Sequence, residues 1–223
     1  LLAHLAALGA HAVTGVSARQ SRVLASDVMP GFNELFPQRF HNSSVGVSPR
    51  RWIRTANPAL AKLLSTTLGP DWPTDPARLA ELERWATDTG FQDAFQAARR
   101  ASKERLARHV LDVVPLSLDP EALFDIQAVR VHEHKRQLLH AMHIVHEYLL
   151  LLDGDPGPAV PRVHVFAGKA SPGYWAAKQT IKLIHCVADV VNRDPRAQGR
   201  LAVAFVPDYR VSIAELLVSA ADV

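Results

Sequence analysis

The chain has 223 residues, of which 48% are hydrophobic, so it is long enough to bury the core of one sizeable domain. Its 25 lysines and arginines against 22 aspartates and glutamates give a net charge of +3, too small to indicate a nucleic-acid-binding protein. The single cysteine, Cys186, excludes an internal disulfide and is typical of a reducing compartment such as the cytoplasm. No run of about 18 apolar residues predicts a membrane span.

The first half of the chain is expected to be mainly helical. Residues 1–10 are apolar and predict the end of a buried helix or strand. Residues 28–52 contain three prolines and two glycines without a helical period, which predicts a long connection and a domain boundary. Asn57-Pro58 and Asp75-Pro76 each predict a capped helix start, and residues 90–114 predict a third helix with a solvated basic face. Three residues of the second helix are expected to face inward: Leu79, Leu82 and Trp85.

Strands alternate with helices from residue 124 onward. Apolar, β-branched segments predict strands at 124–131, 162–166 and 201–206, and each is followed by a helical pattern. Residues 153–161, rich in glycine and proline, predict a surface loop. This alternation predicts an α/β fold with a doubly wound parallel sheet, helices on both faces and ligands at the carboxyl ends of the strands.

A dense positive cluster lies between the first of these strands and its helix. It contains five basic residues: Arg130, His132, His134, Lys135 and Arg136. Cations are unfavourable at a helix start, where the dipole favours anions, so the cluster indicates either a site for an anion such as phosphate or a solvated basic turn. The apolar residues of the helix fall on one face: Leu138, Met142, Val145, Leu149 and Leu152.

The same helix carries His140, His143 and His146 at steps of three, and such steps can place metal ligands on one side of a helix. However, His146 falls toward the apolar stripe, and no His-Glu-x-x-His signature accompanies the three histidines. We therefore predict no metal site here.

Residues 124–137 read Phe-Asp-Ile-Gln-x-x-Arg-x-His-Glu-x-Lys-Arg-Gln, which resembles the phosphate-handling motif of the α-glucan phosphorylases. Four further stretches resemble this family in the same order: Gly9–Val16, Ser48–Trp52, Ala167–Tyr174 and Asp208–Ser212. The resemblance implies a two-domain glycosyltransferase-B-type fold. Residues 1–42 would be the end of the N-terminal domain and the interdomain connection, and residues 43–223 a truncated Rossmann-like C-terminal domain.

The resemblance also implies an activity, namely phosphorolysis of terminal α-1,4-linked glucose in glycogen, starch or maltodextrin to give α-glucose 1-phosphate. Such an enzyme is a cytoplasmic hexosyltransferase that uses pyridoxal 5′-phosphate and is a homodimer when full length. By motif position, Arg130 and Lys135 hold the substrate phosphate as catalytic residues, and His11 and His134 contact the sugar. Four residues match the family's cofactor contacts: Trp52, Tyr209, Arg210 and Val211.

Three positions depart from the family pattern: Val45 stands in place of Asn, Val129 in place of Lys, and His134 in place of Tyr. These departures remove polar contacts to the sugar and the cofactor. They leave two alternatives open, a non-catalytic glycan-binding relative and a nucleotide-sugar glycosyltransferase with Arg130 and Lys135 on a diphosphate. The stretch Tyr209-Arg210-Val211 favours the phosphorylase over both.

The sequence predicts no signal peptide. It has no initiator Met and is expected to be a fragment of a longer chain. None of its six lysines lies after Lys182, whereas the family's Schiff-base lysine follows the Tyr-Arg-Val stretch. We therefore expect the fragment alone to form no imine with the cofactor and to be inactive.

Overall fold

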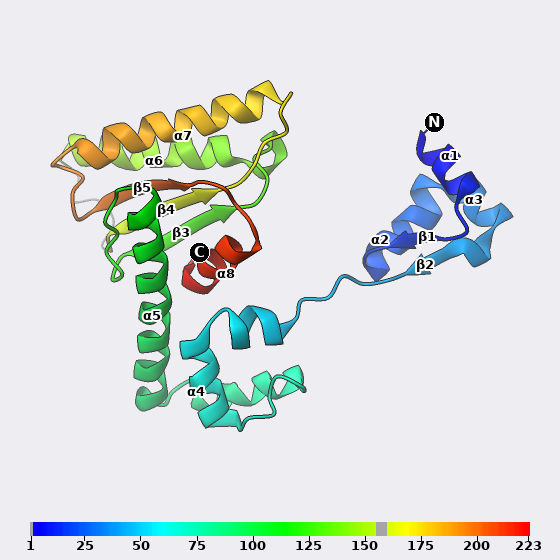
Figure 1. Ribbon diagram of the computed structural model, residues 1–223, viewed down its shortest axis with the longest axis horizontal. Helices are drawn as coiled ribbons and strands as arrows, with labels where there is room; N and C mark the ends of the chain where they lie inside the picture. Colours follow the sequence, from blue (N-terminus) through cyan, green and yellow to red (C-terminus); the bar gives the residue numbers. More distant parts are fainter. Residues whose placement is uncertain (1, 155–159) are drawn as a thin grey trace. The chain divides into compact units, whose positions relative to one another are not determined.

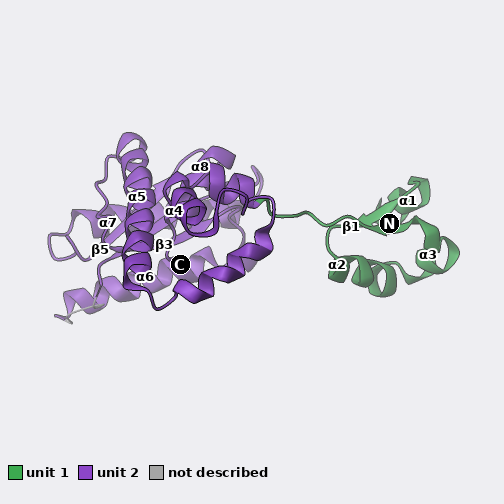
Figure 2. Ribbon diagram, turned by 90° about the horizontal axis from the view of Figure 1, so that it is seen from below, with its two compact units in different colours: residues 1–48 green, residues 49–223 purple. Residues whose placement is uncertain are grey.

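The computed structural model describes residues 2–154 and 160–223. The chain divides into two compact units, residues 1–48 and 49–223 (Figure 2), and each is described by itself. The surface loop predicted at 153–161 falls largely on residues 155–159, which lie outside the described part. The assignment of residues 1–42 and 43–223 to two domains of a longer protein stays a prediction.

Unit 1 is built from short elements around a small parallel pair of strands. In chain order these are α1 (Leu2–Gly9), β1 (Val13–Gly15), α2 (Ala18–Val23), η1 (Leu24–Val28), α3 (Pro30–Leu35), η2 (Pro37–Arg39) and β2 (Phe40–Asn42). Ser17 caps α2 by accepting a hydrogen bond from the Gln20 N–H at 3.2 Å.

Two expectations for this region are wrong. In α1 only Ala7 is buried, because the apolar side chains of this helix are not covered within unit 1. The stretch at 28–52 contains the division between the two units, after residue 48, but it is not irregular throughout, since it contains α3, η2, β2 and the start of η3 (Arg50–Thr55). Pro30 at the first position of α3 and Pro37 at the start of η2 begin helical turns rather than interrupt them.

Unit 2 is organised around a parallel sheet in the order β3 (Leu123–Ala128), β4 (Arg162–Ala167) and β5 (Leu201–Val206) (Figure 1). The crossover helices α6 (Gln137–Leu152) and α7 (Trp175–Arg193) cover one face. Helices α5 (Thr89–Val113) and α8 (Val211–Ala220) cover the other. The predicted α/β class with a doubly wound parallel sheet is therefore confirmed.

Alternate residues of each strand enter two separate cores. Phe124, Val163 and Val165 pack against α5 and α8, whereas Phe166 and Phe205 pack against α6 and α7. Burying each of these large side chains contributes about 1.5–3 kcal/mol. Successive side chains of a strand point to opposite faces of the sheet, so both faces present apolar residues to helices.

Helix α6 turns a different face toward the sheet from the one its apolar stripe suggests. Leu138, Met142 and Leu149 are exposed, whereas the inward positions include Ala141 and Glu147. The reason lies on the facing strands, where three polar residues point toward this helix: Asp125, Gln127 and His164. Because these strand residues are polar, the helix positions that face them are occupied by small or polar side chains.

A helical subdomain precedes the sheet. Its α4 (Pro58–Leu68) is capped by Asn57, whose Oδ1 accepts from the Leu60 N–H, and its 3-10 helix η4 (Pro76–Trp85) is capped by Asp75. Both predicted starts are confirmed. Trp85 is exposed, contrary to expectation, and the fully buried indole belongs to Trp72, which donates to Ser65 Oγ at 3.1 Å.

The basic face of α5 is only partly solvated. Lys103 is buried, and its ammonium donates to the Ala122 carbonyl at 2.8 Å and lies 2.7 Å from Asp222 Oδ2. The residues after α8 lie along β3, because the Asp222 N–H donates to the Phe124 carbonyl at 2.9 Å and the Ile126 N–H to Val223 at 2.9 Å. Among the described helices, none is both long and apolar enough to cross a membrane.

Candidate functional site

Three loops meet at the carboxyl edge of the unit 2 sheet. Ala128, Ala167 and Val206 are the last residues of their strands and are cross-strand partners, so the loops after them begin at the same level. The Val131 N–H donates to the Lys169 carbonyl at 3.1 Å, and Lys169 Nζ lies 3.7 Å from Asp208 Oδ1. The sequence motifs that follow the three strands thus converge at one edge.

The first two loops touch through their backbones. Val129 has φ 93°, in the left-handed region that a β-branched residue rarely adopts. A Cβ atom on Gly168 would lie 1.9 Å from the Val129 carbonyl oxygen. Only a glycine at position 168 allows this approach, and the strain at Val129 lies immediately before the basic cluster.

Arg130 and Lys135 present their charges to solvent from a fixed backbone. The Arg130 carbonyl accepts from Gln137 Nε2 at 3.1 Å, and the Lys135 carbonyl accepts from Gln127 Nε2 at 2.9 Å. Neither cationic group has a hydrogen-bond or ion-pair partner within residues 2–154 and 160–223. Helix α6 follows directly and no side chain caps its start, since Arg136 occupies the cap position with φ 65°. Two available cations beside an uncapped helix start suit an anion.

His134 belongs to a cluster of tilted aromatic rings across the first two loops. Its Nδ1 lies 2.8 Å from Nδ1 of His132, and the His132 ring lies 4.8 Å from the Tyr174 ring, measured between centroids. The Tyr174 hydroxyl donates to the Glu133 carboxylate, and this hydrogen bond raises the pKa of Tyr174. His132 belongs to the predicted basic cluster, whereas Tyr174 was not singled out, although it ends one of the quoted motifs.

The predicted cofactor residues lie at two places in unit 2. Tyr209 is half-buried against the core, Arg210 donates to Asp208 Oδ2 at 2.6 Å, and Val211 is the exposed first residue of α8. These three share the carboxyl edge with Arg130 and Lys135. Trp52 is half-buried in η3, and its neighbour Arg51 forms an ion pair with Glu215 of α8 at 2.8 Å. His11 is exposed in unit 1, so its assignment to the sugar stays a prediction.

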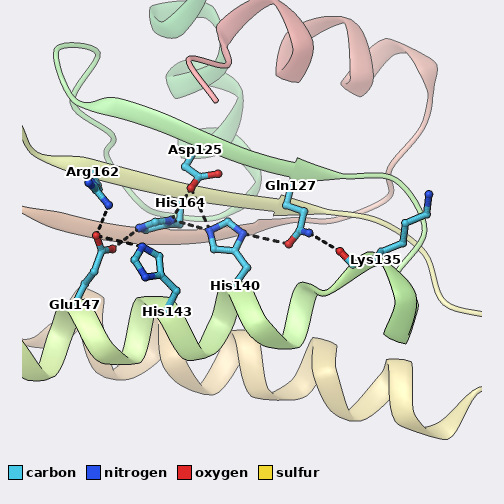
Figure 3. A network of polar contacts seen from close by, with 8 residues as sticks. All are labelled: Asp125, Gln127, Lys135, His140, His143, Glu147, Arg162 and His164. Atoms are coloured by element: carbon cyan, nitrogen blue, oxygen red, sulfur yellow. Dashed lines mark hydrogen bonds and ion pairs between the residues drawn. The ribbon is translucent and has the colours of Figure 1, made fainter.

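A polar network that the sequence did not predict runs behind this edge (Figure 3). It joins β3, β4 and α6 through eight residues: Asp125, Gln127, Lys135, His140, His143, Glu147, Arg162 and His164. The Lys135 side chain points away from the network, which it joins through its carbonyl group.

Two groups in the network have shifted pKa values. Burial lowers the pKa of His140 despite the nearby Asp125 carboxylate. Burial opposes ionisation of Glu147, but its hydrogen bond with His164 and the charge of Arg162 outweigh burial and hold the pKa of this carboxyl below its usual value. Glu147 is therefore a carboxylate at neutral pH. The network could have been anticipated from the polar residues at alternate positions of two otherwise apolar strands.

Comparison with known proteins decides the family. The whole chain, residues 1–223, matches the family model described as Carbohydrate phosphorylase. The chain belongs to the carbohydrate phosphorylase family. This confirms the resemblance that five short motifs indicated.

Three similar proteins illustrate the match. Glycogen phosphorylase of Haemophilus influenzae is 41% identical over 219 residues, which cover 98% of this chain and 27% of that protein. Glycogen phosphorylase of Bacillus subtilis is 40% identical, covering 100% of this chain and 28% of that protein. The liver form of human glycogen phosphorylase is 38% identical, covering 99% and 26%. The chain thus spans about a quarter of the length of these relatives, and it carries part of the glycosyltransferase-B-type fold of the phosphorylases.

Proposed function

We propose that the protein carrying this chain is an α-1,4-glucan phosphorylase. It transfers a terminal α-1,4-linked glucose of glycogen, starch or maltodextrin to inorganic phosphate and releases α-glucose 1-phosphate. The observation that carries this proposal is the pair of exposed cations, Arg130 and Lys135, on the strained loop after β3 in a chain of the carbohydrate phosphorylase family.

The attacking phosphate needs fixed positive charge. Arg130 offers a planar guanidinium fork that matches phosphate oxygens, whereas Lys135 offers a compact charge on a flexible stem. Their carbonyls are held by Gln137 and Gln127, so the loop backbone is positioned before the anion arrives. The uncapped start of α6 adds its backbone N–H groups at the same place.

The loop after β5 carries the residues that we assign to pyridoxal 5′-phosphate. Arg210 stands at the start of α8, which no side chain caps, and the half-buried Tyr209 precedes it. Arg210, whose guanidinium also pairs with Asp208 at 2.6 Å, would add its charge to this helix N-terminus in holding the cofactor's phosphate group. Tyr209, Arg210 and Val211 would hold the cofactor, with Trp52 packed against it. When bound, the cofactor would supply a second phosphate group beside the substrate phosphate.

The sugar is assigned to His134 and His11. His132 occupies Nδ1 of His134, which leaves Nε2 for a sugar hydroxyl. Val45 is exposed and cannot form the side-chain hydrogen bond of the Asn that it replaces. We further propose that the full-length enzyme is a cytoplasmic homodimer, as the resemblance implies.

The family match favours this activity over the two alternatives, a nucleotide-sugar glycosyltransferase and a non-catalytic glycan-binding relative. The test is Arg130→Ala in the full-length protein, assayed for phosphorolysis of maltodextrin. Loss of a charge-assisted contact worth about 1.5–3 kcal/mol should lower kcat/KM roughly tenfold to over a hundredfold and raise the KM for phosphate.

Arg108→Ala is the matched control, because Arg108 is an exposed arginine on α5, on the opposite face of the sheet from α6. It should leave the kinetics unchanged. If Arg130→Ala catalyses phosphorolysis with the kcat/KM and the phosphate KM of the wild type, Arg130 does not bind the substrate phosphate. A wild-type protein that transfers glucose only from a nucleotide sugar, or not at all, would exclude the phosphorylase itself.

A further inference from the structure

Two histidines in the polar network face each other through ring nitrogens, with His140 Nε2 2.9 Å from His164 Nδ1. Gln127 Nε2 must donate to the Lys135 carbonyl, so its Oε1 faces His140 and accepts from His140 Nδ1–H at 3.1 Å. His164 Nε2 lies 2.9 Å from Glu147 Oε2. The outer ring nitrogens of both histidines therefore have oxygen partners, and the remaining nitrogens, His140 Nε2 and His164 Nδ1, point into the same space.

Asp125 completes this arrangement from the neighbouring strand, where it is the cross-strand partner of His164. Its Oδ2 lies 3.5 Å from His140 Nε2 and 3.7 Å from His164 Nδ1, and the two nitrogens are 2.9 Å apart. Three acceptors converge on one point in a site where His164 is fully buried. A positive charge between them, either a proton on one imidazole or a metal ion, stabilises such a group.

The spacing suits a metal ion of the size of zinc. The circle through three atoms separated by 2.9, 3.5 and 3.7 Å has a radius of about 2.0 Å, which is close to the Zn–N and Zn–O bond lengths of about 2.0–2.2 Å. Two imidazoles and one carboxylate are a ligand set that binds Zn²⁺. Gln127 and Glu147 act on the outer nitrogens as the oriented partners that metal-bound histidines require.

We propose that Asp125, His140 and His164 form a binding site for a divalent transition-metal ion, with Zn²⁺ as the ion that fits best. The ion would join β3, α6 and β4, and water would take the remaining coordination position. The Asp125 side chain is 28% exposed and that of His140 12% exposed, so an ion can enter from solvent.

The earlier expectation of no metal site considered ligands on α6 alone, whereas these come from three elements. Through Gln127 the ion would also steady the carbonyl of Lys135, and with it the loop that carries the proposed phosphate ligands. The inference rests on the cluster geometry and not on the proposed activity.

The test is Zn²⁺ binding by the full-length protein after chelation, measured by equilibrium dialysis with metal analysis. The wild type should bind one Zn²⁺ per chain that Asp125→Asn and His140→Asn do not retain. Each of these variants should lose at least about 100-fold in Zn²⁺ affinity. These two replacements keep polar side chains of similar or smaller size. His146→Asn is the matched control, because His146 is an exposed histidine on the same helix outside the cluster, and it should bind like the wild type.

A second measurement keeps the test decisive if a variant misfolds. Co²⁺ added to the chelated wild type should give the visible d–d absorption of a four- or five-coordinate ion, and Zn²⁺ should abolish that absorption. Equal Zn²⁺ binding by wild type and folded Asp125→Asn or His140→Asn would overturn the proposal. So would the absence of the Co²⁺ spectrum, together with histidine nitrogen resonances that show an imidazolium pair and do not respond to Zn²⁺.

Discussion

The backbone of Gly168 passes so close to Val129 that a side chain at position 168 would meet the Val129 carbonyl oxygen at 1.9 Å. This contact joins the loops after β3 and β4, one of which carries Arg130 and Lys135. The position of the proposed phosphate ligands thus depends on the lack of a side chain in the neighbouring loop.

Gly168→Ala should displace the Val129 carbonyl and the cations that follow it. Overpacking of this kind costs about 1–3 kcal/mol of stability, and the KM for phosphate should rise because Arg130 moves. Unfolding midpoints and phosphorolysis kinetics of the full-length protein measure the two effects. Gly173→Ala is the control in the same loop, because a Cβ atom there would contact nothing within 4 Å. If both variants behave like the wild type, the contact does not position the loop.

Val129→Gly tests the strain on the other side of this contact. Glycine adopts positive φ without the steric penalty of about 1–2 kcal/mol that a β-branched residue meets. Part of that gain is offset by greater freedom in the unfolded chain, so the free energy of unfolding should rise by about 1 kcal/mol in urea denaturation. Val47→Gly, at an exposed valine without positive φ, should bring no such gain. A loss of stability in Val129→Gly would show that the valine side chain contributes more than its backbone costs.

Local patterns in the sequence located most elements of unit 2. Asn57-Pro58 and Asp75-Pro76 placed two helix starts, and apolar β-branched runs placed three strands, because caps and strand composition act over a few residues. Convergence of Arg130 with Tyr209 and Arg210 at one edge followed from the strand–helix alternation.

Features that depend on tertiary contacts were not predicted. Three of the five residues in the apolar stripe of α6 are exposed, because Asp125 and His164 on the facing strands determine which side of the helix turns inward. Lys103 is buried because Asp222, more than a hundred residues later, supplies its counter-charge. His140 joins His164 across two elements, a pairing that spacing along one helix does not reveal.

Asp222 should make stability depend on pH. Burial opposes its ionisation, but hydrogen bonds from Lys103, from the Phe124 N–H at 2.7 Å and from Arg99 hold the pKa of this carboxyl below its usual value. A carboxyl whose pKa is lower in the folded state stabilises the fold above its unfolded pKa of about 4, and this contribution is lost as the pH falls through the folded pKa.

Asp222→Asn should therefore lower the free energy of unfolding by about 1.5–3 kcal/mol at pH 7, and the difference from the wild type should shrink as the pH falls below about 4. Urea denaturation of both proteins at several pH values between about 2 and 7 measures this difference in the free energy of unfolding. Asp189→Asn is the control, because Asp189 is an exposed aspartate that forms a surface ion pair with Arg193, and it should cost about 0.5 kcal/mol or less. A deficit in Asp222→Asn that stays constant down to pH 2 would contradict the charge argument.

Tyr174→Phe tests whether the link between the first two loops supports phosphate binding. The Tyr174 hydroxyl donates to Glu133, two residues before Lys135, and accepts from the Glu133 N–H at 3.3 Å. Removing a hydrogen bond worth about 1 kcal/mol should loosen this turn and raise the KM for phosphate about fivefold, with kcat changed less.

Tyr148→Phe makes the same chemical change at the other end of α6, where the hydroxyl donates to Asp194 at 2.6 Å. That control should lower the unfolding midpoint but leave the KM for phosphate unchanged, because Tyr148 does not contact the loops at the carboxyl edge. Equal effects of the two substitutions on the KM would mean that Tyr174 acts through general stability rather than by positioning Lys135.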